Sequence, residues 1–173
     1  MQEIMKGVAG LMALAARTAP KTGGKDQIRL KVIQGEELER LADAMHAYGQ
    51  ESGKRNFDRD GENVRRSEAL LLIGLEEAAT SGLNCGACGY SRCSELEKAR
   101  EGPEFAGPSC FWRGVDLGIA LGSAVKTASI LNADNRIMYR AGVAARRLGL
   151  MEARVVVGIP LSATGKNIYF DRA

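Results

Sequence analysis

The spacing of apolar residues over the first 50 positions predicts a helix, a strand and a second helix. Residues 2–17 place most of their large apolar side chains on one helical face, as expected for a helix that packs on a core. Residues 27–35 alternate between polar and β-branched side chains, which indicates a half-buried strand. Residues 36–48 return to helical spacing, with acidic residues in the first turn, where the helix dipole favours negative charge.

The remainder of the chain predicts further strands and helices. Continuous apolar runs at 68–78 and 153–160 predict two strands that are buried on both faces. The polar, glycine-containing residues 49–66 predict a surface loop. We also expect a helix that is apolar nearly all round at 115–131, a helix at 134–150 that starts at Asp134 and ends at Gly149, and a strand or extended tail at 166–172.

This alternation of helices and strands predicts a mixed α/β or α+β fold around a small sheet. A chain of 173 residues, of which 45% are apolar, is long enough to bury one core, so we expect a single domain over residues 1–173.

Composition narrows the function classes. The chain has 24 basic and 21 acidic residues, a balance that gives no basic footprint for nucleic acid. The single histidine, His46, leaves almost no material for histidine metal sites or catalytic triads. No apolar run approaches the length of about 20 residues that a membrane span needs, and Lys6 interrupts the one stretch that resembles a signal peptide. We therefore expect a cytoplasmic protein with neither a nucleic-acid nor a membrane partner.

Small residues recur along the predicted helix at 115–131 and in the turn before it. Glycines at every fourth position would let another backbone or a flat ligand approach this helix closely. Two interpretations stay open: tight helix packing, within the core or across a dimer, and a ligand surface. The residues concerned are Gly114, Gly118 and Gly122, with Ala120, Ala124 and Ala128 on a neighbouring face.

All four cysteines lie between residues 83 and 113, with the spacing C-x2-C-x4-C-x16-C. No targeting segment indicates an oxidising compartment, which disfavours disulfides, and a thioredoxin-like pair would not need two further cysteines. Zinc held by four thiolates stays the main alternative, although such sites usually join two similar C-x2-4-C halves. Three close thiolates and one distant thiolate are typical of an iron-sulfur cluster. The predicted ligands are Cys85, Cys88, Cys93 and Cys110.

Residues next to the cysteines agree with a cluster. Gly86 and Gly89 allow tight turns that aim N–H groups at cluster sulfurs. Cys93 falls in the first turn of a helix predicted over 91–101, whose dipole favours a thiolate. Arg92 and Arg113 supply positive charge that would favour the reduced cluster.

The stretch NCGACGYSRC, followed by Cys110, resembles the small 4Fe-4S module of Rnf-type electron-transport subunits and corrinoid iron-sulfur proteins. That resemblance implies all four cysteines as cluster ligands. The whole chain, from AARTAPKTGGKDQIRLKV to GIPLSATGKNIYFDR, resembles the uncharacterised family of ferredoxin-domain-containing proteins, mostly from anaerobic bacteria and archaea.

Outside the cysteines the chain is similar to FMN-dependent nitroreductases, through AARTAP and AARRLGLMEARVVVGIP. The resemblance implies an α+β sheet flanked by helices, usually a homodimer with flavin at the subunit interface, here with a cysteine-rich insertion. Where the nitroreductase pattern has serine and asparagine near the flavin, this chain has Lys21 and the run Gly23-Gly24-Lys25. The candidate contacts to a flavin phosphate are Arg17, Lys21, Lys25 and Lys166, although solvated loop charges explain the first three equally well.

We therefore expect a redox protein that transfers electrons through a 4Fe-4S cluster, to or from a flavin if FMN is bound. A redox partner protein and a homodimer are expected, and a small-molecule substrate is left open. The alternatives are a ferredoxin-like carrier or docking module without flavin, and a zinc-stabilised structural protein. No residue pattern indicates a general acid, base or nucleophile, so whether the protein is a flavin-dependent oxidoreductase stays open and no catalytic residue is assigned.

Overall fold

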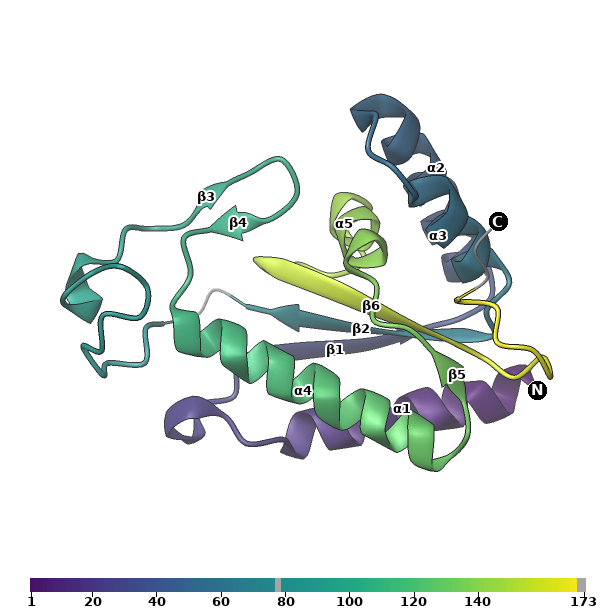
Figure 1. The fold of residues 1–173 in the computed structure, drawn as a ribbon, viewed down its shortest axis with the longest axis horizontal. Helices are drawn as coiled ribbons and strands as arrows, with labels where there is room; N and C mark the ends of the chain where they lie inside the picture. The colour runs from purple at the N-terminus through teal and green to yellow at the C-terminus, as the bar shows by residue number, and fades with distance from the viewer. Residues whose placement is uncertain (77–78, 171–173) are drawn as a thin grey trace.

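The computed structural model describes residues 1–76 and 79–170 and shows an antiparallel sheet between two helical layers (Figure 1). The sheet has four strands in the order β1-β2-β6-β5, all neighbours antiparallel. This arrangement confirms the predicted α+β class. The strands are β1 (Ile28–Ile33), β2 (Ala69–Leu75), β5 (Asp134–Asn135) and β6 (Val155–Ser162). One face of the sheet is covered by α1 (Gln2–Thr18) and α4 (Phe111–Ile130). The other face is covered by α2 (Glu36–Ser52), α3 (Phe57–Arg65) and α5 (Tyr139–Arg147).

The central strand β2 is buried along its whole length, as its continuous apolar run predicts. Leu71 and Ile73 face the core beneath α1 and α4, whereas Leu70 and Leu72 face the core beneath α2 and α5. Side chains of a strand alternate between the two faces, so an all-apolar strand must be covered twice. The predictions for the first helix, the first strand, the helix from residue 36 and the strand at 153–160 are confirmed as well.

The prediction of a loop over 49–66 is wrong. The second helix continues to Ser52, and α3 then covers Phe57–Arg65. Phe57 and Val64 lie seven residues apart on one helical face and are both fully buried. Charged and polar residues predominate in the sequence of this helix and hide its short apolar face. One of the charged residues, Asp60, is itself buried.

The helix expected at 115–131 is α4. Its apolar sequence predicts burial on all sides, but one of its faces is exposed. Its alanines at 120, 124 and 128 are fully buried in the core that α4 shares with α1. The glycines at 114, 118 and 122 face open space, because no atom lies within 4 Å of the position that a Cβ would occupy at each of them. Close packing within the described part of the chain therefore uses the alanine face, and the glycine face lies open.

The segment expected to be one helix at 134–150 contains two elements. Asp134–Asn135 pair with the end of β6 as an edge strand, and α5 starts only at Tyr139. The predicted stop is confirmed: Gly149 has φ 68°, and the N–H groups of Gly149 and Leu150 bond to carbonyls in the last turn of α5. Gly142 lets α5 lie directly on β6, since a Cβ there would come within 1.7 Å of the Val156 carbonyl oxygen.

Residues 163–170 form neither a strand nor an extended tail: the backbone bends at 164–166 and again at 168–170, and Ile168 and Tyr169 are buried in the core beneath α2 and α5. Positions 171 and 172 of the expected segment, and 77 and 78 of the expected central strand, lie outside the described residues. No helix in the described part of the chain is long and apolar enough to span a lipid bilayer.

Candidate functional site

The cysteine segment projects beyond one end of the sheet, before the short hairpin of β3 (Arg100–Glu101) and β4 (Ala106–Gly107) (Figure 1). None of the residues from 82 to 100 is buried. The helix predicted over 91–101 is not formed, and Cys93–Glu95 make only a single 3-10 turn. This stretch has one large aliphatic residue, Leu96, so it lacks an apolar face on which a helix could dock.

Two cysteine sulfurs receive N–H groups. The indole N–H of Trp112 donates to Cys85 Sγ over 3.2 Å, and the backbone N–H of Asn84 donates to Cys93 Sγ over 3.3 Å. The side chain of Asn84 accepts the N–H of Cys93 in return, at 2.8 Å. The sequence indicated N–H donation to the sulfurs from the glycine turns, but the donors that the structure shows are these two residues.

Cys110 stands at the N-terminus of α4, where it is the N-cap residue, and its side chain is buried. Its Sγ lies 3.7 Å from the hydroxyl oxygen of Ser81. Burial by itself raises the pKa of the Cys110 thiol, but hydrogen bonds from Ser81 and from the backbone N–H groups of Trp112 and Arg113 lower the pKa more, so the net shift is downward. The site thus favours a thiolate, the form that binds metal.

The four cysteines are all free thiols. Within residues 1–76 and 79–170, no group of three or more histidine, cysteine, aspartate and glutamate side chains is close enough together to hold a metal ion. The contacts of Cys85 with Trp112 and of Cys110 with Ser81 nevertheless bring both ends of the segment to the N-terminus of α4. A set of soft sulfur donors with N–H groups aimed at two of them fits a thiolate-bound cluster, and the four cysteines stay the predicted ligands.

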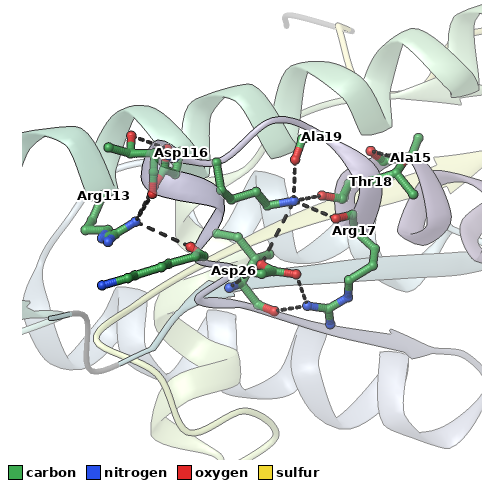
Figure 2. A network of polar contacts seen from close by, with 12 residues as sticks. Ala15, Arg17, Thr18, Ala19, Asp26, Arg113 and Asp116 are labelled. Carbon is green, nitrogen blue, oxygen red and sulfur yellow. Dashed lines mark hydrogen bonds and ion pairs between the residues drawn. The ribbon is translucent and has the colours of Figure 1, made fainter. Parts of the chain in front are cut away.

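A buried ion pair lies directly behind this site (Figure 2). Arg113 and Asp116, both nearly inaccessible, are 3.0 Å apart on α4. Arg113 also donates to the carbonyls of Thr22, Lys25 and Ala79, and Asp116 accepts both the N–H and the hydroxyl of Thr22 at 2.8 Å. Arg113 is therefore neutralised and ties three segments together, so the expectation that it supplies free positive charge to a cluster is wrong.

Two of the predicted phosphate-binding cations, Lys21 and Arg17, already donate hydrogen bonds within the protein (Figure 2). The Lys21 ammonium donates to the carbonyls of Ala16, Arg17 and Ala19 at 2.7–2.8 Å and so caps the C-terminus of α1. The Arg17 guanidinium donates to Asp26 and to the Ile28 carbonyl.

The other two predicted cations are exposed. Lys25 extends from the same loop, next to the 3-10 turn Thr22–Gly24. Lys166 belongs to the tail at the opposite end of the molecule (Figure 1). The structure thus brings Arg17, Lys21 and Lys25 together and leaves Lys166 apart.

The fold places the chain in a known structural class. It is similar to the nitroreductase CinD from Lactococcus lactis in complex with nicotinic acid, at 14% identity and a TM-score of 0.59, over 96% of this chain and 84% of that one. It is also similar to a nitroreductase with bound FMN from Desulfitobacterium hafniense, at 14% identity and a TM-score of 0.56, over 92% of this chain and 78% of that one. The fold is thus that of the nitroreductases.

Sequence comparison narrows this class to a family. The family model described as "Uncharacterized protein containing a ferredoxin domain (DUF2148)" matches residues 106–172, which include Cys110. An uncharacterized protein from Archaeoglobus fulgidus is 53% identical over 172 residues, covering 99% of this chain and 93% of its own. The chain belongs to this family of ferredoxin-domain proteins. Family and fold together indicate a redox function.

Proposed function

We propose that the protein transfers electrons through a 4Fe-4S cluster held by Cys85, Cys88, Cys93 and Cys110. The observation that carries this proposal is the absence of any buried residue from 82 to 100, in a segment whose beginning is tied to the N-terminus of α4 through Cys85 and Ser81. A segment with no buried side chain gains little order from packing, and metal ligation contributes folding free energy of its own.

When bound, such a cluster accepts and donates one electron at a time. The chain's own residues would set how readily this happens. The N–H groups of Trp112 and Asn84 stabilise negative charge on sulfur, and the N-terminal dipole of α4 acts in the same direction at Cys110. Because the segment is exposed, a redox partner protein can approach it directly. Thiols kept free for ligation suit a reducing compartment, so we place the protein in the cytoplasm.

The second part of the proposal is an FMN that exchanges electrons with the cluster. It is supported by the fold, since the similar structure from Desulfitobacterium hafniense has FMN bound. Among the candidate phosphate contacts, Lys25 and Lys166 are exposed. A phosphate at Lys21 or Arg17 would replace hydrogen bonds that these side chains already donate. A ferredoxin-like carrier without flavin is the alternative.

We further propose a homodimer that covers the outer surface of α1 and α4. This surface exposes large apolar side chains next to the open glycine face of α4. Exposed apolar surface of this extent is typical of protein interfaces, and the glycines would allow a partner helix to approach closely. The exposed apolar residues are Ile4, Leu11 and Leu14 on α1 and Ile119 and Ile130 on α4.

Anaerobic purification tests the proposal. The wild-type protein should be brown, with about four iron and four sulfide per chain and a broad absorption band near roughly 400 nm. Cys88→Ser should lose the iron while its far-ultraviolet circular dichroism stays close to wild type, because the cores lie elsewhere. Ser91→Ala, three residues away in the same exposed segment, is the matched control and should keep the iron.

Each other result has a defined meaning. Full iron content in Cys88→Ser would refute the ligand assignment, and stoichiometric zinc in place of iron would leave a zinc-stabilised structural protein. Titration of the purified protein with FMN then separates the two redox alternatives, since a carrier without flavin would show no saturable binding.

A further inference from the structure

A buried carboxylate at the opposite end of the molecule from the cysteines is surrounded by three arginines. The Asp60 side chain, on α3, is 1% exposed. Arg59 donates to its Oδ1 through Nε and Nη2, at 3.0 and 2.8 Å, and Arg140 donates to its Oδ2 over 2.8 Å. Arg136 lies 3.7 Å from the same carboxylate and donates to the Tyr169 carbonyl.

This arrangement holds more positive charge than the fold requires. One buried carboxylate needs one well-placed cation, and each further cation adds an uncompensated charge and its own desolvation cost. Within the described residues, Asp60 is the only carboxylate that forms an ion pair with Arg59, Arg136 or Arg140, so three positive charges face one negative charge.

The position of Arg136 and Arg140 at the N-terminus of α5 adds to the excess of positive charge. Arg140 lies in the first turn of α5 and Arg136 lies just before it, and this turn contains no acidic residue. The N-terminus of a helix carries partial positive charge, which disfavours cations and favours anions. Positive charge in excess of the paired carboxylate, placed at the positive end of a helix, breaks a local rule of the kind that functional sites break.

The three guanidinium groups are held in place but accessible. Their side chains are 34% (Arg59), 27% (Arg136) and 21% (Arg140) exposed. The Arg140 guanidinium lies over the rings of Phe57 and Tyr139, and that of Arg136 lies over Phe170. Because the side chains are already ordered, little conformational entropy would be lost on binding a ligand.

Donors also remain for a ligand. Within the described part of the chain, the Nη2 groups of Arg136 and Arg140 make no hydrogen bond to the protein. Guanidinium groups match the oxygens of a phosphate in geometry and charge. We propose that Arg59, Arg136 and Arg140 form a binding site for a phosphate-type oxyanion, either inorganic phosphate or the phosphate group of a nucleotide.

The test is calorimetric titration of the purified wild-type protein with inorganic phosphate, with sodium chloride of matched ionic strength in the reference. We expect saturable binding that chloride does not reproduce. Arg136→Gln should bind phosphate at least about tenfold more weakly, since it removes one charged donor. Its fold should persist, because Asp60 keeps Arg59 and Arg140.

Arg147→Gln is the matched control. Arg147 lies at the other end of α5 and pairs with Glu51, so its loss should leave phosphate binding unchanged. Asp60→Asn acts in the opposite direction, because it removes the competing negative charge, and a folded Asp60→Asn protein should bind phosphate more tightly.

Parallel titrations with AMP and adenosine identify the source of the phosphate group. Tighter binding of AMP than of phosphate, with no binding of adenosine, assigns a nucleotide, and equal binding assigns free phosphate. The proposal is overturned if neither phosphate nor AMP binds above the chloride reference, or if Arg136→Gln binds them as tightly as wild type.

Discussion

Replacing Arg113 with methionine tests whether the buried ion pair behind the cysteine segment holds this end of the molecule together. Methionine is unbranched and apolar and fills about the same space as the aliphatic part of the arginine side chain. The substitution therefore removes the guanidinium and little else. Among the described residues, it leaves the buried Asp116 carboxylate with Thr22 as its one remaining partner, and it leaves the carbonyls of Thr22, Lys25 and Ala79 without this donor.

The expected cost follows from burial. Removing one partner of a buried, hydrogen-bonded ion pair costs about 3–5 kcal/mol, because the remaining charge stays uncompensated in a medium of low polarity. For a chain of this length, each kcal/mol lowers the melting temperature by about 2–4 °C. A loss of about 4 kcal/mol therefore predicts a fall of roughly 8–16 °C.

Urea and thermal unfolding followed by circular dichroism measure this loss. Arg65→Met is the matched control, because Arg65 pairs with Glu39 and Asp43 at the exposed surface, where ion pairs contribute about 1 kcal/mol at most. The double variant Arg113→Met/Asp116→Leu should regain much of the stability, since it buries no unpaired charge. If Arg113→Met is no less stable than Arg65→Met, the ion pair does not stabilise this end of the fold.

Three further predictions concern packing, acid stability and redox potential. Gly142→Ala should be strongly destabilised because its Cβ would overlap a carbonyl oxygen of β6, whereas Gly118→Ala, which meets open space inside a helix, should be at least as stable as wild type. Burial raises the pKa of Asp26, but the hydrogen bond from Arg17 and further polar contacts lower it more, so the net pKa lies below its usual value. Asp26→Asn should therefore be less stable than wild type at pH 7. In urea unfolding, this difference in stability should disappear below about pH 4, where Asp26 becomes protonated. If the cluster forms, Trp112→Phe should lower its midpoint potential in spectroelectrochemistry, because a donor to sulfur is lost.

The two long strands and the first two helices could be predicted from the sequence because each depends on its own apolar pattern. An all-apolar run such as β2 can only be a strand or helix covered on both sides, and its length decides between them. The short helix α3 could not be predicted in this way. Its buried face includes the charged residue Asp60, which is paired with Arg140, and nothing local indicates that residues 80 positions apart pair.

The candidate site shows the same limit. A sequence identifies Lys21 and Arg17 as cations but not the direction in which they point, and the structure turns Lys21 back onto the last carbonyls of its own helix. One signal was available: Arg113 and Asp116 stand three residues apart in an otherwise apolar helix, a spacing that places them on one face. Charged residues at helical spacing in an apolar helix indicate a buried ion pair before they indicate a ligand.

The helix α4 connects the separate parts of the proposed function. Its N-terminus carries Cys110 and Trp112, its alanine face packs on α1, and its glycine face is open. A ligand or partner helix seated on the glycines would therefore contact the same rigid element that holds the fourth cysteine. Since the cysteine segment contributes no buried residue from 82 to 100, loss of the cluster should change that segment and leave the sheet and its helices folded. Hydrogen exchange of the Cys88→Ser protein checks this: faster exchange confined to the segment is expected, and faster exchange throughout β2 would show that the cluster holds the core.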